Sequence, residues 1–329
     1  MAFALGERIS WEAHVGHILV SVEGYDAIQC EPCGFVDVVP LPSAQELEDY
    51  YRTSFYEDSK PDYFASAERD REWLNIGYDM KLDMLDEVLA PLANGSAKPR
   101  RVLDIGSGPG HFLLRAKERG WTAVGLETSP AAVEFSRALG VEVHEGYFDG
   151  SELPELGQFD AIHMQHVLEH APDPVGLLEG LPSLLKPGGA ICIEVPNDFS
   201  IVQDILHNSM KFPAWWVAPP EHLNYFRRES LDATLTRSGF ATTAWTSQFP
   251  IDLALLAGFN YVNDAEMGRK VHQHRVRFET GLADRKSLLR NLYSSLLKVG
   301  VGREIVVVAR EMDRFGQPQV SKDQWRSLE

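Results

Sequence analysis

Three glycines at alternate positions, directly after a short apolar segment, constrain the fold of this 329-residue chain more than any other feature. The segment 101–105 reads Arg-Val-Leu-Asp-Ile, and Gly106, Gly108 and Gly110 follow it. An amphipathic run, 111–117, comes next, so the pattern predicts a buried strand, a tight turn and a helix start. Glycine permits positive φ and the close approach of a ligand. The free N–H groups at the helix start would face that ligand.

The spacing of these glycines excludes two common phosphate-binding loops. The dinucleotide fingerprint G-x-G-x-x-G requires a glycine where this chain has His111. A Walker-type loop requires a Gly-Lys-Ser/Thr sequence, which does not follow here. The pattern is instead D-x-G-x-G-x-G, and its carboxylate, Asp104, would repel a pyrophosphate but suits an ammonium or sulfonium cation. The alternative is an ordinary strand-to-helix turn in another kind of α/β enzyme.

This stretch resembles motif I of class I S-adenosylmethionine (SAM)-dependent methyltransferases, and later segments match the same family in order. Residues 123–127 resemble its motif II, residues 159–174 its FDxI…LEHxxDP segment, and residues 186–197 its LKPGG…VPN segment. Strands that alternate with helical runs predict a parallel sheet. The resemblance implies an α/β fold, a Rossmann-like seven-stranded and mostly parallel sheet with helices on both faces. We expect its last two strands at 241–247 and 303–309.

The resemblance also implies a set of SAM contacts. Glu127 ends the second strand, where a carboxylate can accept both ribose hydroxyls. Tyr63 and Arg71, ahead of motif I, are candidates for the SAM carboxylate, with packing and surface charge as the alternative. The remaining implied contacts are Asp104, Gly106, Ser107, Gly108, Gly110, His111, Phe112, Thr128, Ser129, Tyr147, Phe148, Gln165 and His166.

Two pairs of metal-binding residue types lie near the N-terminus. His14 and His17 form an H-x2-H pair, and Cys30 and Cys33 form a C-x2-C pair twelve residues later. Two such pairs can complete a tetrahedral zinc site with no open position, so the metal would be structural. The segment resembles a zinc-ribbon leader of some sugar and small-molecule methyltransferases, although both pairs are usually cysteines there. The alternative is two surface histidines and a reduced cysteine pair.

Three histidines are candidates for a base that assists methyl transfer, since imidazole titrates near neutral pH. They are His222, in a stretch that we expect to cover the acceptor pocket, then His166 at a strand end, then His170. No side-chain base is needed if the acceptor is already an amine or an acid. Cys192 alternates within a strand and is predicted to lie in the core rather than to act as a nucleophile.

Composition limits the partners of the chain. Its net charge of −17 argues against nucleic acid, because phosphate contacts require clustered Lys and Arg. A nucleic-acid amino-methyltransferase would also carry an Asn/Asp-Pro-Pro-aromatic tetrapeptide where this chain has residues 165–168. We see no secretory leader and no apolar run of about 20 residues, and three cysteines are too few for a disulfide scaffold. We therefore expect a cytoplasmic enzyme with a small-molecule substrate and no membrane partner. A homodimer is one assembly that the sequence leaves open.

These observations divide the chain into five parts. They are a zinc-ribbon-like hairpin at 1–42, a helical cap at 43–98, the SAM-binding core at 99–200, a substrate lid with a helical insertion and the last two strands at 201–312, and a tail at 313–329. The expected function is SAM-dependent methylation of a small molecule, at an oxygen of a sugar or natural-product intermediate. Nitrogen or carbon methylation, or a regulator that binds SAM or zinc without turnover, are the alternatives.

Overall fold

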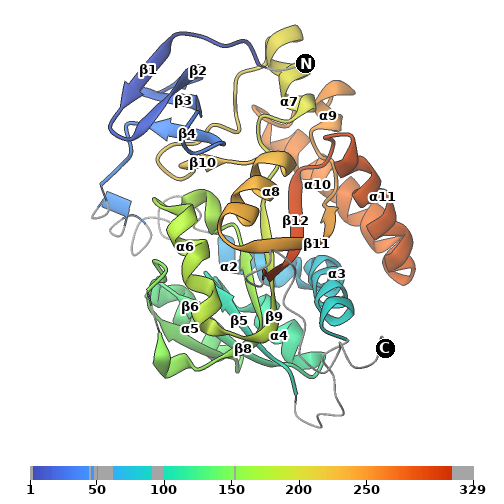
Figure 1. Ribbon diagram of the computed structural model, residues 1–329. Coiled ribbons are helices and arrows are strands. Elements are labelled where there is room, and N and C mark those ends of the chain that lie inside the picture. The colour runs from blue at the N-terminus through green and yellow to red at the C-terminus, as the bar shows by residue number, and fades with distance from the viewer. Residues whose placement is uncertain are drawn as a thin grey trace, which may run out of the picture.

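The computed structural model describes residues 3–43, 46–47, 50, 62–90, 99–151 and 153–312. Two sheets organise this part of the chain (Figure 1). The expected tail, and parts of the expected 43–98 cap, lie outside the described residues. No helix among the described residues is both long enough and apolar enough to cross a membrane.

The larger sheet has the strand order β11-β12-β9-β8-β5-β6-β7. Its strands are β5 (Arg101–Ile105), β6 (Thr122–Glu127), β7 (Glu142–Glu145), β8 (Phe159–Gln165), β9 (Leu185–Pro196), β11 (Phe240–Ser247) and β12 (Glu304–Glu311). The pairs from β7 through to β9 are parallel, and β12 runs antiparallel to both of its neighbours. This confirms the predicted seven-stranded, mostly parallel sheet, including its last two strands.

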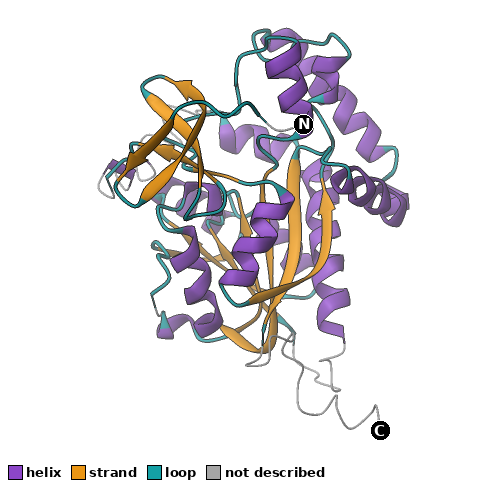
Figure 2. Ribbon diagram, turned by 45° about the horizontal axis from the view of Figure 1, so that its top comes forward, coloured by secondary structure: helices purple, strands orange, loops and turns teal. Residues whose placement is uncertain are grey.

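Helices cover both faces of this sheet (Figure 2). Alternate residues of a strand point to opposite faces, and this separates two apolar clusters. Leu103 and Ile162 pack with α6 and α8 in one cluster, and Val102 and Ala161 pack with α3 and α4 in the other. The helices concerned are α3 (Arg71–Leu89), α4 (His111–Glu118), α5 (Pro130–Ala138), α6 (Pro174–Gly180) and α8 (Arg228–Arg237). Cys192 lies in the second cluster with no exposed surface, as expected for a core residue.

The smaller sheet is antiparallel and has the order β1-β2-β3-β4-β10. Its strands are β1 (Arg8–Trp11), β2 (His14–Val22), β3 (Tyr25–Cys30), β4 (Val36–Val39) and β10 (Asn224–Tyr225). The N-terminal segment thus forms a larger sheet than the expected hairpin. The strand β10, far away in the sequence, completes this sheet. Trp216, six residues before His222, is 2% exposed and packs with Phe3 and Tyr225 beside this sheet. An indole gains more by burial there than by facing solvent.

The remaining helices include α2 (Tyr63–Arg69), α7 (Ile201–Asp204) and α9 (Leu253–Leu256). The predicted helical insertion forms α10 (Ala265–Thr280) and α11 (Lys286–Lys298), which pack against α3 and β11. In Figure 1 they stand beside the β11–β12 edge of the larger sheet. This places the insertion next to the carboxyl ends of β8 and β9.

Candidate active site

The glycine turn between β5 and α4 has the backbone that its sequence requires. Gly106, Gly108 and Gly110 have φ of 69°, 50° and 76°, and Gly110 caps α4. A Cβ on Gly106 would lie 2.6 Å from Val167 Cγ2, in the loop that follows β8. The turn is therefore packed directly against the end of the neighbouring strand β8.

Glu127, at the end of β6, holds this turn. Its Oε2 accepts a hydrogen bond from the Gly108 N–H at 2.7 Å, and its Oε1 accepts one from the Ser129 N–H at 2.9 Å. The side chain is almost fully buried, and this burial raises the pKa of Glu127 although the two N–H donors oppose the rise. Ser129 also accepts a hydrogen bond from the Ala132 N–H and so caps α5. The predicted neighbours Glu127, Thr128 and Ser129 thus lie at the glycine turn.

Asp104 lies beneath the turn rather than in its opening. Its Oδ1 is 2.7 Å from Nδ1 of His163, a β8 residue on which the ring of Phe112 stacks with centroids 3.7 Å apart. Burial raises the pKa of Asp104 to about 8, against the effect of Lys81, and it lowers the pKa of His163 well below its usual value. The predicted contacts Asp104 and Phe112 therefore form a buried layer under the loop.

The helix α2 covers one side of the turn. His111 Nε2 lies 3.0 Å from Glu68 Oε2, and the ring of Phe64 stacks on that of Phe135 at 5.0 Å. Tyr63 is in this helix, and burial together with the nearby Glu127 carboxylate raises its pKa. Arg71 instead pairs with Glu68 at the surface, 3.1 Å away, which agrees with the surface-charge alternative.

The two aromatic residues that we predicted to contact SAM after β7 have different environments in the structure. Tyr147 is 56% exposed, whereas Phe148 is 2% exposed and belongs to the core cluster with Leu126 and Leu156. Phe148 is therefore not placed to stack on a base, because the chain after β7 turns its side chain into the core. Tyr147 remains the candidate at that strand end.

The fit of this site to SAM can be judged from groups that lack a partner. The Ser107 hydroxyl is shielded from solvent and makes no hydrogen bond within the described residues. Glu127 is bound by neutral N–H and hydroxyl groups, so none of its hydrogen bonds within the described residues neutralises its charge. A cationic ligand with hydroxyl groups would satisfy both positions, so the residues present fit a sulfonium nucleoside.

A second cluster of polar side chains lies at the carboxyl ends of β8 and β9, one strand away from the glycine turn. Lys81 of α3 donates to Gln165 Oε1 at 2.7 Å and to Glu194 Oε2 at 2.8 Å. His166 has φ of 54°, and its Nδ1 lies 2.9 Å from Glu169 Oε1. Both predicted strand-end residues, Gln165 and His166, are thus brought to one place.

The electrostatics of this cluster favour a charged imidazole. Burial alone would lower the pKa of His166, but the carboxylates of Glu304, Glu169 and Glu194 together raise it to about 9. Burial would likewise raise the pKa of Glu169, yet its contact with His166 holds it at about 2. His166 and Glu169 therefore form an ion pair at neutral pH.

The two other histidine candidates, His170 and His222, lie outside this cluster. His170 Nδ1 is 2.6 Å from the Glu221 carbonyl oxygen, and its ring meets that of His222 at 5.0 Å. Burial lowers the pKa of His222 to about 3, and its Nδ1 is shielded without a partner among the described residues. His222 therefore remains neutral and takes up a proton only weakly.

A cavity of about 210 Å³ opens at this cluster. It is walled by α3, by the ends of β8, β9 and β12, and by α10. Its polar lining residues are Lys81, Gln165, His166, Glu194, Gln248, Arg275, Glu279 and Glu304. Of the three histidine candidates only His166 lines it. Sequence reasoning missed Lys81, Arg275, Glu279 and Glu304, because no motif marks them and they converge only in the folded chain.

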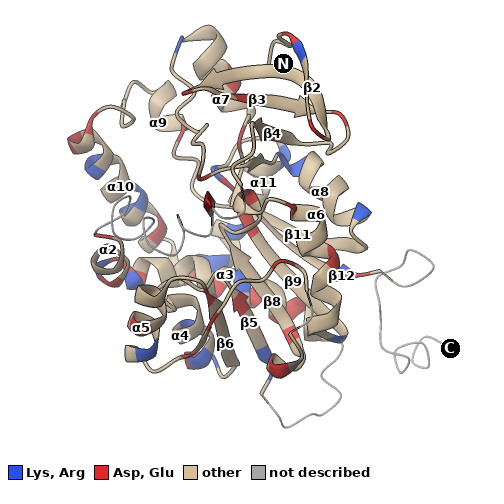
Figure 3. Cartoon of the chain, turned by 90° about the vertical axis from the view of Figure 1, so that its left-hand side faces the viewer, with Lys and Arg blue, Asp and Glu red and all other residues tan. Residues whose placement is uncertain are grey.

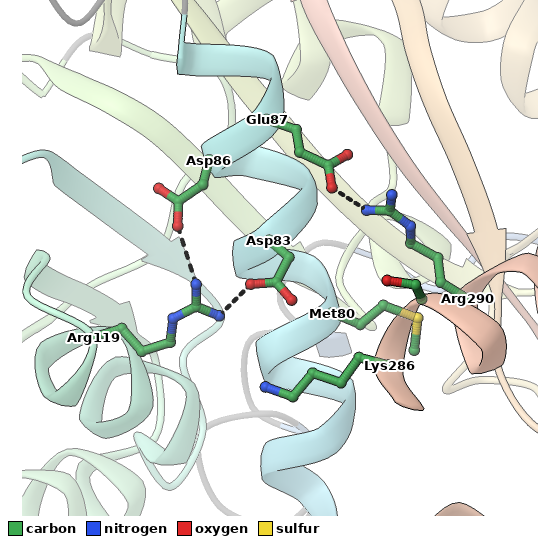
Figure 4. Close-up of a pocket in the computed structure, with 8 residues that line it drawn as sticks. Met80, Asp83, Asp86, Glu87, Arg119, Lys286 and Arg290 are labelled. Atoms are coloured by element: carbon green, nitrogen blue, oxygen red, sulfur yellow. Dashed lines mark hydrogen bonds and ion pairs between the residues drawn. The ribbon is translucent and has the colours of Figure 1, made fainter. Parts of the chain in front are cut away.

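A second hollow, of about 230 Å³, lies on the outer side of α3 (Figure 4). Its charged side chains pair with one another, because Arg119 bonds Asp83 at 2.7 Å and Arg290 bonds Glu87 at 2.7 Å. This hollow differs from the glycine turn, because its charged side chains already have partners. We assign it no role in the site.

The N-terminal sheet brings together three of the four predicted metal ligands. His14 Nδ1 lies 3.7 Å from Cys30 Sγ, 3.6 Å from Cys33 Sγ and 2.9 Å from Asp37 Oδ2. His17 is not part of this cluster, and its Nδ1 lies 3.0 Å from the Gly6 carbonyl oxygen. The prediction of His17 is corrected to Asp37. Residues three apart on a strand point to opposite faces of the sheet, so His14 and His17 cannot bind the same metal ion.

Comparison with known proteins agrees with this geometry. The fold, the glycine turn and Glu127 define the class I SAM-dependent methyltransferases. A family model described as a methyltransferase domain matches residues 68–244, more than half of the chain, so the chain belongs to this methyltransferase family.

Individual relatives are more distant. The chain is 30% identical over 154 residues to a ubiquinone biosynthesis O-methyltransferase of Xanthomonas axonopodis, covering 44% of this chain and 64% of that protein. It is 37% identical over 132 residues to a tRNA U34 carboxymethyltransferase of Syntrophotalea carbinolica, covering 38% of each. The chain thus spans less than two thirds of these relatives. A SAM-dependent methyltransferase from Archaeoglobus fulgidus, at 20% identity and a TM-score of 0.45, covers 75% of this chain and 98% of its own.

Proposed function

We propose that the protein transfers the methyl group of SAM to a small molecule. The observation that carries this proposal is the bond between Glu127 and the Gly108 N–H, 2.7 Å long, beside a polar cavity at the next strand ends. The cavity lies where open α/β sheets bind ligands.

In this proposal the glycine turn, Glu127 and Tyr63 hold the nucleoside. Bound SAM supplies an electrophilic methyl group on a positively charged sulfur. The chain contributes mainly by holding the acceptor in line with that methyl, and such positioning can account for much of a methyl-transfer rate. The His166–Glu169 pair orients the acceptor, and the neutral form of His166, which is the minor form at neutral pH, takes up the acceptor's proton. We assign this role to His166 because it lines the cavity and His222 does not.

The acceptor atom is proposed to be oxygen. The relative named for ubiquinone biosynthesis is an O-methyltransferase, and another relative, from Methylobacterium radiotolerans, is named trans-aconitate 2-methyltransferase. Nucleic acid is a poorer candidate despite the tRNA-related relative, because the chain carries a net charge of −17. Figure 3 shows Lys and Arg interspersed with Asp and Glu on the face in view. A sugar acceptor remains a narrower form of this proposal.

The decisive experiment is calorimetric titration of the folded protein with SAM and with S-adenosylhomocysteine. We expect binding of both, weakened roughly 10- to 100-fold in Glu127→Gln, since the lost contacts are charge-assisted hydrogen bonds. Glu142→Gln, which alters an exposed carboxylate on β7, should bind as the wild type does. Failure of folded protein to bind either nucleoside would reject the proposal. Binding without any methyl transfer in a cell extract would favour a regulator instead.

We also propose a structural zinc ion in the N-terminal sheet, held by His14, Cys30, Cys33 and Asp37. Ligand atoms around a tetrahedral zinc, at Zn–S of about 2.3 Å and Zn–N of about 2.0 Å, lie roughly 3.5 Å apart. The His14 Nδ1 distances of 3.7 and 3.6 Å to the two sulfurs agree with that value. Metal analysis of the purified protein tests this, and absence of zinc with both cysteines freely alkylated would reject it.

A further inference from the structure

Arg275 of α10 lines the cavity at the ends of β8 and β9 and lies against an aromatic side chain. Its guanidinium lies over the indole of Trp73, with Cζ 4.3 Å from the ring centroid. Its Nε is shielded from solvent and makes no hydrogen bond within the described residues. A cation–π contact stabilises the guanidinium, but it leaves the Nε–H donor unused. Buried donors of a charged group are costly to leave unpaired, so this arrangement points to a missing anion.

The nearby acids do not supply that anion. Glu279 accepts from Trp73 Nε1 at 2.6 Å and from Tyr293 Oη at 2.7 Å, and no ion pair joins it to Arg275. Burial lowers the pKa of Arg275, and the charges of Glu279 and Glu304 only oppose this shift. Glu304, like Glu279, makes no direct ion pair with this arginine. Both acids line the same cavity as Arg275. The guanidinium is thus held near carboxylates and kept free for a ligand.

The cavity also offers an unused acceptor. Oε2 of Glu304 is shielded from solvent and has no hydrogen-bond partner within the described chain. Glu304 begins β12, and its carboxylate is grouped with those of Glu194 and the imidazole of His166, with ligand atoms within 4.8 Å of one another. One orphan donor at Arg275 and one orphan acceptor at Glu304 therefore belong to a single cavity.

We propose that this cavity binds a small acceptor bearing a carboxylate at one end and a hydroxyl or amine at the other. The proposal rests on the proposed methyltransferase function. Arg275 binds the carboxylate, because its planar guanidinium matches that group with two parallel hydrogen bonds. Glu304 accepts a hydrogen bond from the hydroxyl or amine, beside His166.

Charge and size restrict the acceptor further. The cavity is lined by three acids, Glu194, Glu279 and Glu304, so a doubly charged phosphate would be repelled more strongly than a carboxylate. Its volume of about 210 Å³ falls below the range of roughly 300–1,000 Å³ that is usual for drug-sized ligands. The acceptor is therefore a compact hydroxy acid or amino acid.

The transfer balances without any further reactant. A new bond forms between the acceptor oxygen or nitrogen and the methyl carbon, while the carbon–sulfur bond of SAM breaks and its electron pair stays on sulfur. The acceptor's proton passes to His166 or to water. The carboxylate held by Arg275 is unchanged by the reaction and serves only for binding.

The test is transfer of tritiated methyl from SAM to matched acids and amides. The probes are salicylate with salicylamide, glycolate with glycolamide, and serine with serinamide. We expect at least one acid to be methylated, with its amide at least tenfold poorer in kcat/KM. Amides as good as their acids, or no methylation of any acid by protein that binds SAM, would overturn the proposal and leave the methyltransferase function intact. Loss of SAM binding would reject both.

A pair of variants on α10 localises the effect. Arg275→Gln should raise KM for the acid by roughly 10- to 100-fold, since a charge-assisted contact is lost, while kcat and SAM affinity change by less than about threefold. Arg277→Gln, on the same helix but exposed, should leave KM unchanged. Equal KM in Arg275→Gln and wild type, or equal losses in both variants, would contradict the assignment of Arg275.

Discussion

The ammonium of Lys81 and the carboxylate of Glu194 lie 2.8 Å apart, with side chains only 3% and 1% exposed. This ion pair joins α3 to β9 at the wall of the cavity that His166 lines. Lys81 also donates a hydrogen bond to Gln165, and this second contact helps to hold the ammonium beside Glu194. The pair therefore links the helix that covers the sheet to the strand ends that form the site.

Replacing Lys81 with methionine is expected to destabilise the fold strongly. The change leaves Glu194 as a buried charge without its partner, which costs about 3–5 kcal/mol of unfolding free energy. Lys270→Met, which breaks an exposed pair with Glu266, should cost less than about 1 kcal/mol. Urea unfolding measures both. A double variant, Lys81→Met with Glu194→Gln, should recover part of the loss, and no recovery would argue against this account.

The glycine at position 106 should be more restrictive than other glycines with positive φ. Gly106→Ala forces a methyl group to 2.6 Å from Val167 Cγ2, whereas Gly140→Ala, at a φ of 79°, meets no atom within 4 Å. Both variants lose about 1–2 kcal/mol for the left-handed backbone, and Gly106→Ala loses roughly 1–3 kcal/mol more by overpacking.

Urea unfolding of these variants separates the cost of the left-handed backbone from the cost of overpacking. Adding Val167→Ala to Gly106→Ala should restore the overpacking part but not the backbone part. If Gly106→Ala and Gly140→Ala lose equal stability, the contact with the β8 loop does not matter.

The proposed zinc ligands can be distinguished by substitution. Asp37→Ala and Cys33→Ser should lower bound zinc well below one ion per chain, whereas His17→Ala should retain it, because the His17 ring lies outside the cluster. Inductively coupled plasma analysis measures the metal. Loss of zinc in His17→Ala with retention in Asp37→Ala would restore the sequence-based ligand set.

Activity should rise with pH as His166 loses its proton. Its pKa lies near 9 because carboxylates outweigh the effect of burial, so the base form is scarce at neutral pH. The rate with an acceptor acid should therefore increase up to about pH 9, and His166→Gln should abolish that rise. In His222→Gln the profile should persist, since His222 does not line the cavity. Loss of the rise in His222→Gln alone would identify His222 as the base.

Local patterns predicted the core of the fold but not the contacts that close the site. The glycine spacing and apolar runs predicted β5, β6, β8 and β9, because each depends on a few consecutive residues. Asp37 joined the metal cluster through pairing of β4 with β3, and spacing along the chain does not reveal such pairing. Glu304 reaches the cavity that Arg275 also lines because β12 pairs antiparallel with β9.

The sequence also did not reveal which of these side chains are buried or which residues they contact. Phe148 follows a predicted strand end as Tyr147 does, yet one side chain is in the core and the other is exposed. Asp104 was predicted to face a cation, and the structure pairs it with His163. In both cases the direction of a side chain was set by residues far away in the sequence.

The pairing of Asp104 with His163 predicts how SAM affinity depends on pH. Burial raises the pKa of Asp104 to about 8, and the pKa of His163 is well below its usual value, so the pair is uncharged at neutral pH. A sulfonium bound nearby favours the ionised carboxylate, so SAM binding releases a proton. Affinity for SAM should rise as the pH increases towards 8, by at most roughly tenfold per pH unit, and level off above it.

S-adenosylhomocysteine has an uncharged sulfur and should show a weaker dependence. Calorimetry of both nucleosides between about pH 6 and pH 9 measures the difference. Asp104→Asn should make the two profiles parallel, whereas Asp149→Asn, which alters an exposed acid after β7, should leave them as in the wild type. Parallel profiles in the wild type would mean that Asp104 does not sense the charge on sulfur, and its place under the glycine turn would then serve packing alone.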